Sequence, residues 1–266
     1  MLSYQHMYHA GGLADVHKHI LLARALAHLT IGPEPLLYAE THSGRGRYYL
    51  DHPAAEKTGE AAQGIKRLLR DQRIAQKEPF LRTLKAVQKG NPRLYPGSPL
   101  IAASLLRAQD RLWLWELHPQ EHGWLSRLFE HDKRVTVRKA DGLAGINLYI
   151  PPKPPNPQKG LVLIDPSYEV KAEYDALPAS IARLRQRWPD AAGMVWYPML
   201  PALRHEPMRE ALTAQNTGIR VNELVWADPK DVRGLFGSGL AYWGLDGAGL
   251  GKPSFPAVSV PKGASL

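Results

Sequence analysis

The 266-residue chain contains no cysteine. Disulfide bonds, thiolate zinc sites and cysteine nucleophiles are therefore excluded. Long hydrophobic runs are also missing: the apolar stretch ILLARALAHL is broken by Arg24 and His28 and is far shorter than the roughly 20 residues that a membrane-spanning helix needs. The opening residues, MLSYQHMYHAGG, lack the basic start and apolar middle of a secretion signal. We therefore expect a cytoplasmic protein with no membrane segment.

Acidic residues are scarce relative to basic ones, 25 against 34, which gives a formal charge of +9. Much of the excess lies between Lys57 and Arg93, where ten lysines and arginines accompany three acids. A segment of this kind is typical of nucleic-acid contacts and equally of a solvated helical face. The charge favours a polyanionic partner, and Lys66, Arg67 and Arg70 are our candidates for contacts to phosphates.

Seven apolar, β-rich runs recur along the chain, and helix-like segments separate most of them. The expected strands are 35–40, 112–116, 134–138, 160–165, 192–198, 220–227 and 239–244. The expected helices are 13–29, 98–108, 118–131, 171–187 and 206–214. This alternation predicts an α/β fold with a largely parallel sheet. The short polar connection before the last strand favours an antiparallel pairing there, which suits a methyltransferase-type sheet.

About 70 residues separate the first two strands, whereas a crossover needs on the order of 10 to 30. The extra residues, 51–95, have apolar side chains at helical spacing and predict a small inserted basic helical subdomain. The main domain would then comprise 1–50 and 96–246. Residues 247–266 lack any periodicity, so we expect a flexible tail.

Four acids end predicted strands or follow them closely: Glu40, Glu116, Asp141 and Asp165. Because the carboxyl ends of parallel strands meet at one edge of a sheet, we expect these acids to line a single cleft. The stretch ETHSGRGRY after the first strand lacks the third glycine of the dinucleotide fingerprint. A ligand with hydroxyls, an amine and a positive centre fits better, since Glu116 could accept ribose hydroxyls and Asp141 an adenine amino group. S-adenosylmethionine is such a ligand.

Motifs along nearly the whole chain resemble the RlmJ family of large-subunit (23S) rRNA adenine-N6 methyltransferases. They are MLSYQHMYHAGGLADVHKH, THSGRGRY, YPGSPLIA (95–102), ELHP (116–119), DG (141–142), DPSYE (165–169), WYP (196–198) and GSGL (237–240). The resemblance implies a Rossmann-like class I S-adenosylmethionine-dependent methyltransferase with a seven-stranded, mostly parallel sheet. Two departures stand out: Ser167 replaces the second proline of the usual Asp-Pro-Pro-Tyr, and WGLDGAG follows where Asn-Pro-Pro-Trp is expected.

The resemblance also implies roles for individual residues. The cofactor would be contacted by His19, His42, Ser98, Glu116, Asp141, Gly142 and Asp165. The RNA would contact Tyr4, with His6 and Lys18 near it, and Asp165 would be catalytic.

The stretch LIDPSYE, residues 163–169, has a chemical rationale in this reaction. An adenine amine is a poor nucleophile because its lone pair is delocalised into the ring. The Asp165 carboxylate and the Pro166 carbonyl can accept its two N–H bonds, and Tyr168 can stack on a base that has left its helix. Positioning for in-line attack on the sulfonium methyl would supply much of the acceleration.

Three other functions are compatible with parts of the sequence. A catalytically weakened RNA-binding relative would account for the basic segment and Ser167, but it has no need of acids at four strand ends. A DNA adenine-N6 methyltransferase shares the chemistry, and only the opening motif argues against it. A metallohydrolase would use the histidines at 6, 9, 17 and 19, whose spacing matches no metal motif. We therefore expect no metal, ribosomal RNA as the partner, and favour a monomer.

Overall fold

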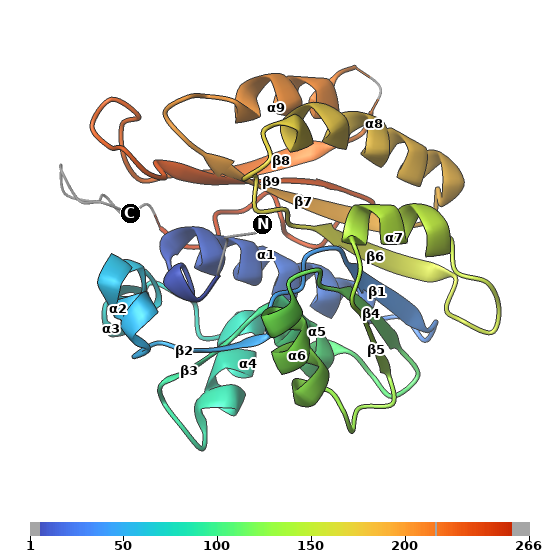
Figure 1. The fold of residues 1–266 in the computed structure, drawn as a ribbon, viewed down its shortest axis with the longest axis horizontal. Coiled ribbons are helices and arrows are strands. Elements are labelled where there is room, and N and C mark those ends of the chain that lie inside the picture. The colour runs from blue at the N-terminus through green and yellow to red at the C-terminus, as the bar shows by residue number, and fades with distance from the viewer. Residues whose placement is uncertain (1–5, 216, 257–266) are drawn as a thin grey trace.

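The computed structural model describes residues 6–215 and 217–256, and a seven-stranded sheet forms its centre (Figure 1). The strands are β1 (Leu36–Glu40), β4 (Arg111–Trp115), β5 (Val135–Arg138), β6 (Lys159–Ile164), β7 (Ala192–Met199), β8 (Arg220–Val225) and β9 (Gly237–Trp243). These are the seven strands that the sequence predicted, with ends that differ by at most two residues.

The sheet has the order β5-β4-β1-β6-β7-β9-β8. Strands β5, β4, β1, β6 and β7 run parallel, while β9 lies antiparallel between β7 and β8. This order, with one reversed strand near the edge, is that of the Rossmann-like class I methyltransferases, and the predicted fold class is confirmed. Although WGLDGAG departs from the family pattern at its end, β9 is buried along its whole length.

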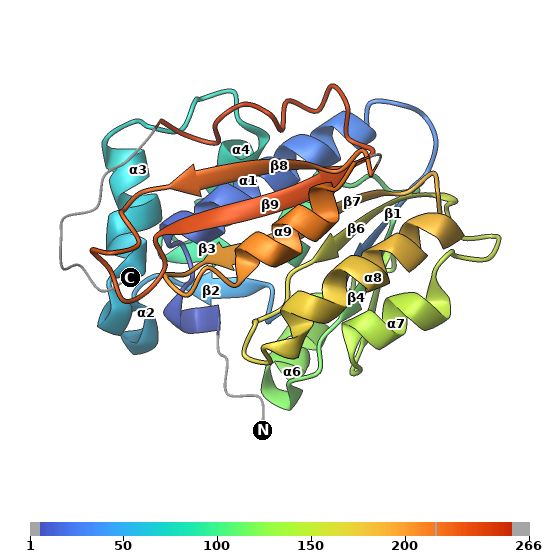
Figure 2. The same ribbon diagram turned by 90° about the horizontal axis from the view of Figure 1, so that it is seen from above.

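Helices cover both faces of the sheet (Figure 2). One layer contains α1 (Leu13–Leu29), α5 (Ser98–Leu105) and α6 (Pro119–Leu128); the other contains α7 (Gly142–Tyr149), α8 (Ala172–Arg187) and α9 (His205–Thr213). Successive residues of β1 pack on opposite faces of the sheet. Leu36 and Tyr38 are buried in the hydrophobic core that contains α1, whereas Leu37 and Ala39 are buried in the core that contains α8. Burial on both faces explains why the strands are continuously apolar.

Residues 47–96, between β1 and α5, form a mostly helical unit beside the first layer. It comprises α2 (Pro53–Thr58), a π-helical turn η2 (Ala62–Lys66), α3 (Arg67–Arg70) and α4 (Pro79–Gln88). Its base is a two-stranded antiparallel sheet of β2 (Arg47–Tyr49) and β3 (Leu94–Pro96), which the sequence did not reveal. Ile65, Phe80 and Leu84 are buried in the same core as α1. The insertion therefore shares a hydrophobic core with the helix that runs under the sheet.

Residues 247–256, in the segment predicted as a tail, pack against the body of the protein. Leu250 and Phe255 are buried, and the Asn222 side-chain amide donates a hydrogen bond of 2.6 Å to the Leu250 carbonyl. The sequence did not indicate this packing, because single apolar residues such as Leu250 and Phe255 form no periodic pattern. The remainder of that segment, 257–266, lies outside the described residues. Among the helices described, none has the length and apolar character to cross a membrane.

Candidate active site

A cavity of about 490 Å³ opens where the parallel strands end. Its wall contains most of the residues that the sequence predicted: His6, Lys18, His19, His42, Ser98, Glu116, Asp141, Gly142, Asp165, Pro166 and Tyr168. Tyr4 lies outside the described residues. Lys66, Arg67 and Arg70 are not in the cavity wall but on η2 and α3 of the insertion, where Lys66 and Arg70 are exposed.

The loops after β4 and β5 present two carboxylates to the cavity. The two oxygens of Glu116 accept hydrogen bonds from the backbone N–H groups of Gly44 and His118, both at 2.7 Å. Burial raises the pKa of Glu116, although these two hydrogen bonds act against the shift. Asp141 accepts from the Ala144 N–H at 2.8 Å and so caps α7. Backbone bonds thus fix the direction of both carboxylates.

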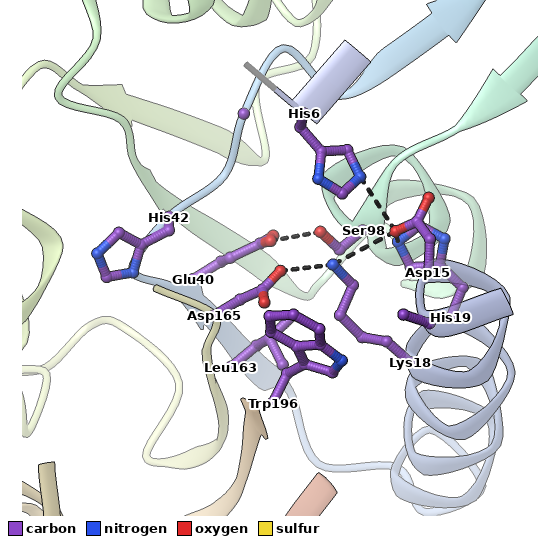
Figure 3. Close-up of polar contacts among 12 residues, drawn as sticks. His6, Asp15, Lys18, His19, Glu40, His42, Ser98, Leu163, Asp165 and Trp196 are labelled. Carbon is purple, nitrogen blue, oxygen red and sulfur yellow. Dashed lines mark hydrogen bonds and ion pairs between the residues drawn. The ribbon is translucent and has the colours of Figure 1, made fainter. Parts of the chain in front are cut away.

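Glu40, the last residue of β1, does not line the cavity, so the prediction that all four acids do is wrong for this one. Its carboxyl is fully buried and accepts hydrogen bonds from Ser98 Oγ and from the Tyr38 hydroxyl, the latter at 2.9 Å (Figure 3). Ser98, at the start of α5, stands between Glu40 and the cavity. Burial raises the pKa of Glu40 to about 8, so this carboxyl is mostly protonated at neutral pH.

Asp165 directly follows β6 and is paired with a buried lysine of α1 (Figure 3). Lys18 Nζ lies 2.6 Å from Asp165 Oδ2 and 3.4 Å from Asp15 Oδ1. Burial would lower the pKa of Lys18, but the charges of Asp165 and Asp15 outweigh it and raise the pKa above its usual range. The lysine is therefore charged. Its ammonium also lies 5.5 Å from the centre of the Trp196 ring, a distance at which a cation and an aromatic face attract.

Tyr168 forms a rigid part of the wall. Its hydroxyl donates a hydrogen bond of 2.6 Å to the Trp196 carbonyl, and its ring centre is 4.4 Å from that of Tyr174. The backbone φ is +57°, a left-handed conformation that is costly for a bulky residue and is retained only where its surroundings hold it. The hydrogen bond and the ring contact supply that restraint. Pro166 is buried beside it, and the Ser167 hydroxyl accepts a long 3.4 Å bond from the Glu169 N–H.

The histidines of the first segment belong to separate networks. His6 Nε2 and His19 Nε2 lie 3.1 and 3.4 Å from Asp15 Oδ1, and burial lowers the pKa of His19 to about 3. His17 instead contacts Asn222 and Ser238 at 3.0 and 2.9 Å, away from the cavity wall. Within 6–215 and 217–256, no three His, Asp or Glu side chains are grouped so that they could hold a metal ion.

His42 lies in the loop after β1. It forms a hydrogen bond of 2.7 Å with the Thr41 hydroxyl, and burial lowers the pKa of its imidazole.

Four acids of the cavity wall escaped the sequence analysis: Asp15, Glu60, Glu121 and Glu173. Asp15 precedes Lys18 by three residues on α1, a helical spacing that could have indicated the pair. Glu60 comes from the insertion and Glu173 from the first turn of α8, and neither stands in a recognisable pattern.

This sheet order, with Glu116, Asp141 and Asp165 converging on one cavity, defines a Rossmann-like methyltransferase. Residues 33–244 match the family model described as "Ribosomal RNA large subunit methyltransferase D, RlmJ". The chain belongs to the RlmJ family, as the motifs predicted.

Individual relatives agree with this assignment. The chain is 40% identical over 245 residues to ribosomal RNA large subunit methyltransferase J of Escherichia coli strain K12, covering 90% of this chain and 86% of that one. It is 41% identical over 248 residues to the protein of the same name from Haemophilus influenzae, with the same coverage. Among solved structures, a protein from Legionella pneumophila has a TM-score of 0.78 at 36% identity, covering 89% of this chain and 87% of that one.

Proposed function

We propose that this protein transfers the methyl group of S-adenosylmethionine to N6 of an adenine in 23S ribosomal RNA. One observation carries the proposal: Asp165 of the Asp-Pro-Ser-Tyr motif shares a cavity with Glu116 and Asp141 in a chain of the RlmJ family. The same cavity therefore has acceptors for a nucleoside cofactor and, beside them, acceptors for a target amine.

The donor set of the cavity fits S-adenosylmethionine. Glu116, whose oxygens are already aligned by two backbone bonds, would accept the ribose hydroxyls, and Asp141 the adenine amino group. Ser98, His19 and His42 would contact the methionine end, and Gly142 would leave room at the Asp141 turn. The bound cofactor would supply an electrophilic methyl group on a positively charged sulfur.

Lys18 and Asp165 would prepare the target amine. The Lys18 ammonium, 2.6 Å from Oδ2, orients the Asp165 carboxylate, whose other oxygen would act as a hydrogen-bond acceptor. With the Pro166 carbonyl, it would hold both N–H bonds of the adenine amine and turn the nitrogen lone pair toward the methyl group. Tyr168, held in one orientation, would face the flipped base. The proton released after methyl transfer would pass from the nitrogen to Asp165 and then to water.

The basic insertion would bind RNA phosphates outside the cavity. Lys66, Arg67 and Arg70 lie together on η2 and α3, and His6 would contact the substrate at the cavity. Tyr4 is proposed as a further RNA contact from the sequence alone. Phosphate contacts position an RNA without reading its sequence. We further propose that 51–95 acts as an RNA-binding subdomain of a monomeric, cytoplasmic enzyme.

The test is methyl transfer to unmodified 23S rRNA, with N6-methyladenosine identified by mass spectrometry of the nucleosides. Asp165→Asn keeps the shape of the side chain but removes its charge, and kcat should fall on the order of 10²-fold or more. The exposed Asp190 provides a matched control, since Asp190→Asn should retain full activity. A near-normal rate in Asp165→Asn would refute the catalytic role. A wild-type protein that binds rRNA but transfers no methyl group would point instead to a relative that has lost its chemistry.

A further inference from the structure

The insertion contributes one buried acid to the cavity wall. Glu60, between α2 and η2, is 5% exposed, and its Oε1 lies 2.7 Å from Nδ1 of His9. Both side chains line the cavity. The insertion is therefore part of the cavity as well as a basic surface beside it.

Two more contacts attach the insertion to the same short stretch of chain, residues 8–12. The Thr58 hydroxyl donates a hydrogen bond of 2.6 Å to the Tyr8 carbonyl, and the Ile65 N–H donates one of 2.8 Å to the Gly11 carbonyl. Gly64 makes this approach possible, because a Cβ at that position would overlap the Gly11 carbonyl oxygen. The two backbones thus touch directly.

The other side of this stretch is tied to the network around Asp165. The 3₁₀ turn η1 (His6–Tyr8) places His6 Nε2 3.1 Å from Asp15 Oδ1, and the Gly11 N–H donates a 3.0 Å bond to Asp15 Oδ2 (Figure 3 shows the His6 contact). Asp15 in turn lies 3.4 Å from Lys18, the partner of Asp165. A continuous series of polar contacts therefore runs from the insertion through the segment before α1 to Asp165.

The contact between Glu60 and His9 is an ion pair whenever His9 is protonated. Among the described residues, Glu60 of the insertion and Asp15 and Lys18 of α1 act on His9 through their charges. Burial and Lys18 would lower the pKa of His9, but the hydrogen bond and charge of Glu60, with Asp15, raise it above its ordinary value. His9 consequently holds its proton, and this contact, until a higher pH than an unpaired histidine would.

We propose that Glu60 is a positioning residue for methyl transfer, which holds His9 and the adjoining turn η1 so that the cavity wall next to Lys18 and Asp165 has the geometry the RNA requires. This inference rests on the proposed function. It gives the insertion a second role: besides binding phosphates, it fixes the segment that carries His6. Glu60 acts through His9 and touches no reacting atom.

The experiment compares Glu60→Gln with Glu56→Gln, a change of the same kind at an exposed position of the same segment. We measure kcat and KM on unmodified 23S rRNA across pH, the cofactor Kd by calorimetry, and Tm. Glu60→Gln should lower kcat about tenfold, while the cofactor Kd changes less than twofold and Glu56→Gln behaves as wild type. The decline of kcat at alkaline pH that follows His9 deprotonation should begin at a lower pH in Glu60→Gln.

Two further measurements separate positioning from a merely structural role. His9→Gln should cause a similar loss, and the double variant should lose no more than either single one, because both remove the same contact. NMR titration of His9 should give a lower pKa in Glu60→Gln than in wild type, whether or not the enzyme turns over. Unchanged kcat in Glu60→Gln, additive losses, or a loss that follows Tm and vanishes on cooling would each overturn the inference. An inactive wild type would contradict the proposed function instead.

Discussion

Lys18 and Asp165 form an ion pair where the parallel strands end. Lys18 and Asp165 are 147 positions apart, yet they form an ion pair of 2.6 Å, and the charges of Asp165 and Asp15 raise the pKa of Lys18 although burial would lower it. The residue types at the strand end were predictable, because an acid after an apolar strand is visible in the sequence. The pairing was not, since it depends on how α1 docks beneath β6.

Glu40 leads to a prediction about stability and pH. Its pKa is about 8 in the folded protein, against an ordinary value of 4.5, so between these two pH values the folded state holds a proton that the unfolded state releases. Folding stability must therefore decrease as pH rises through this range, by at most about 1.4 kcal/mol per pH unit from this group. Glu40→Gln, which cannot ionise, should remove that part of the decrease.

Urea denaturation of wild type and Glu40→Gln at pH 6 and pH 9 measures the effect. The variant should lose less stability than wild type between pH 6 and pH 9, because its amide does not ionise. It should still fold, since the amide can accept a hydrogen bond from Tyr38 and donate one to Ser98. Identical losses in the two proteins would mean that Glu40 is not protonated in the folded state near neutral pH.

At the scale of elements, the strands were easier to predict than the short helices. The apolar runs located all seven strands of the sheet. Helix α7 was missed because its eight residues, GLAGINLY, include two glycines and have no periodicity. Its position is set by tertiary contacts instead: the Asp141 cap, and the packing of Gly145 against Trp115. Tertiary contacts also turn Glu40 toward Ser98, which no pattern within β1 could indicate.

The start of α7 can be tested through Gly142. A Cβ at this position would overlap the Thr41 carbonyl, so the loop after β1 and the turn after β5 touch through their backbones. Gly142→Ala should force them apart, weaken cofactor binding at least tenfold and destabilise the protein by about 1–3 kcal/mol.

Calorimetry with S-adenosylmethionine and chemical denaturation measure the two effects. The control is Gly123→Ala within α6, where a Cβ meets no atom within 4 Å and should raise stability by about 0.5–1 kcal/mol. Undiminished cofactor affinity in Gly142→Ala would separate this contact from the cofactor site.

On the scale of the whole molecule, the net charge of +9 predicts binding driven by phosphates. Arg70 is 71% exposed at its side chain, and Asp71, with which it forms an ion pair at 2.9 Å, is itself partly exposed. Such a surface pair is weak and leaves the arginine available to RNA. The sequence located the basic residues of the insertion, but it could not show that Lys66, Arg67 and Arg70 lie outside the cavity wall.

Reversing Lys66, Arg67 and Arg70 to glutamate should therefore weaken RNA binding and make it less sensitive to salt, with cofactor affinity unchanged. Filter binding to 23S rRNA fragments between 50 and roughly 200 mM salt gives the slopes. The matched control reverses Lys133, Lys153 and Lys230, which are exposed and lie outside the insertion. Equal slopes for the two triple variants would show that the insertion has no special share in RNA binding.

The reversed strand β9 has a consequence for how the chain is made. It lies between β7 and β8, although it leaves the ribosome after both. The nascent polypeptide can assemble the five parallel strands early, but β8 has no partner in the sheet until residues 237–243 emerge to fill the gap beside β7. The sheet of this rRNA methyltransferase is thus completed only after its last strand in sequence has been synthesised.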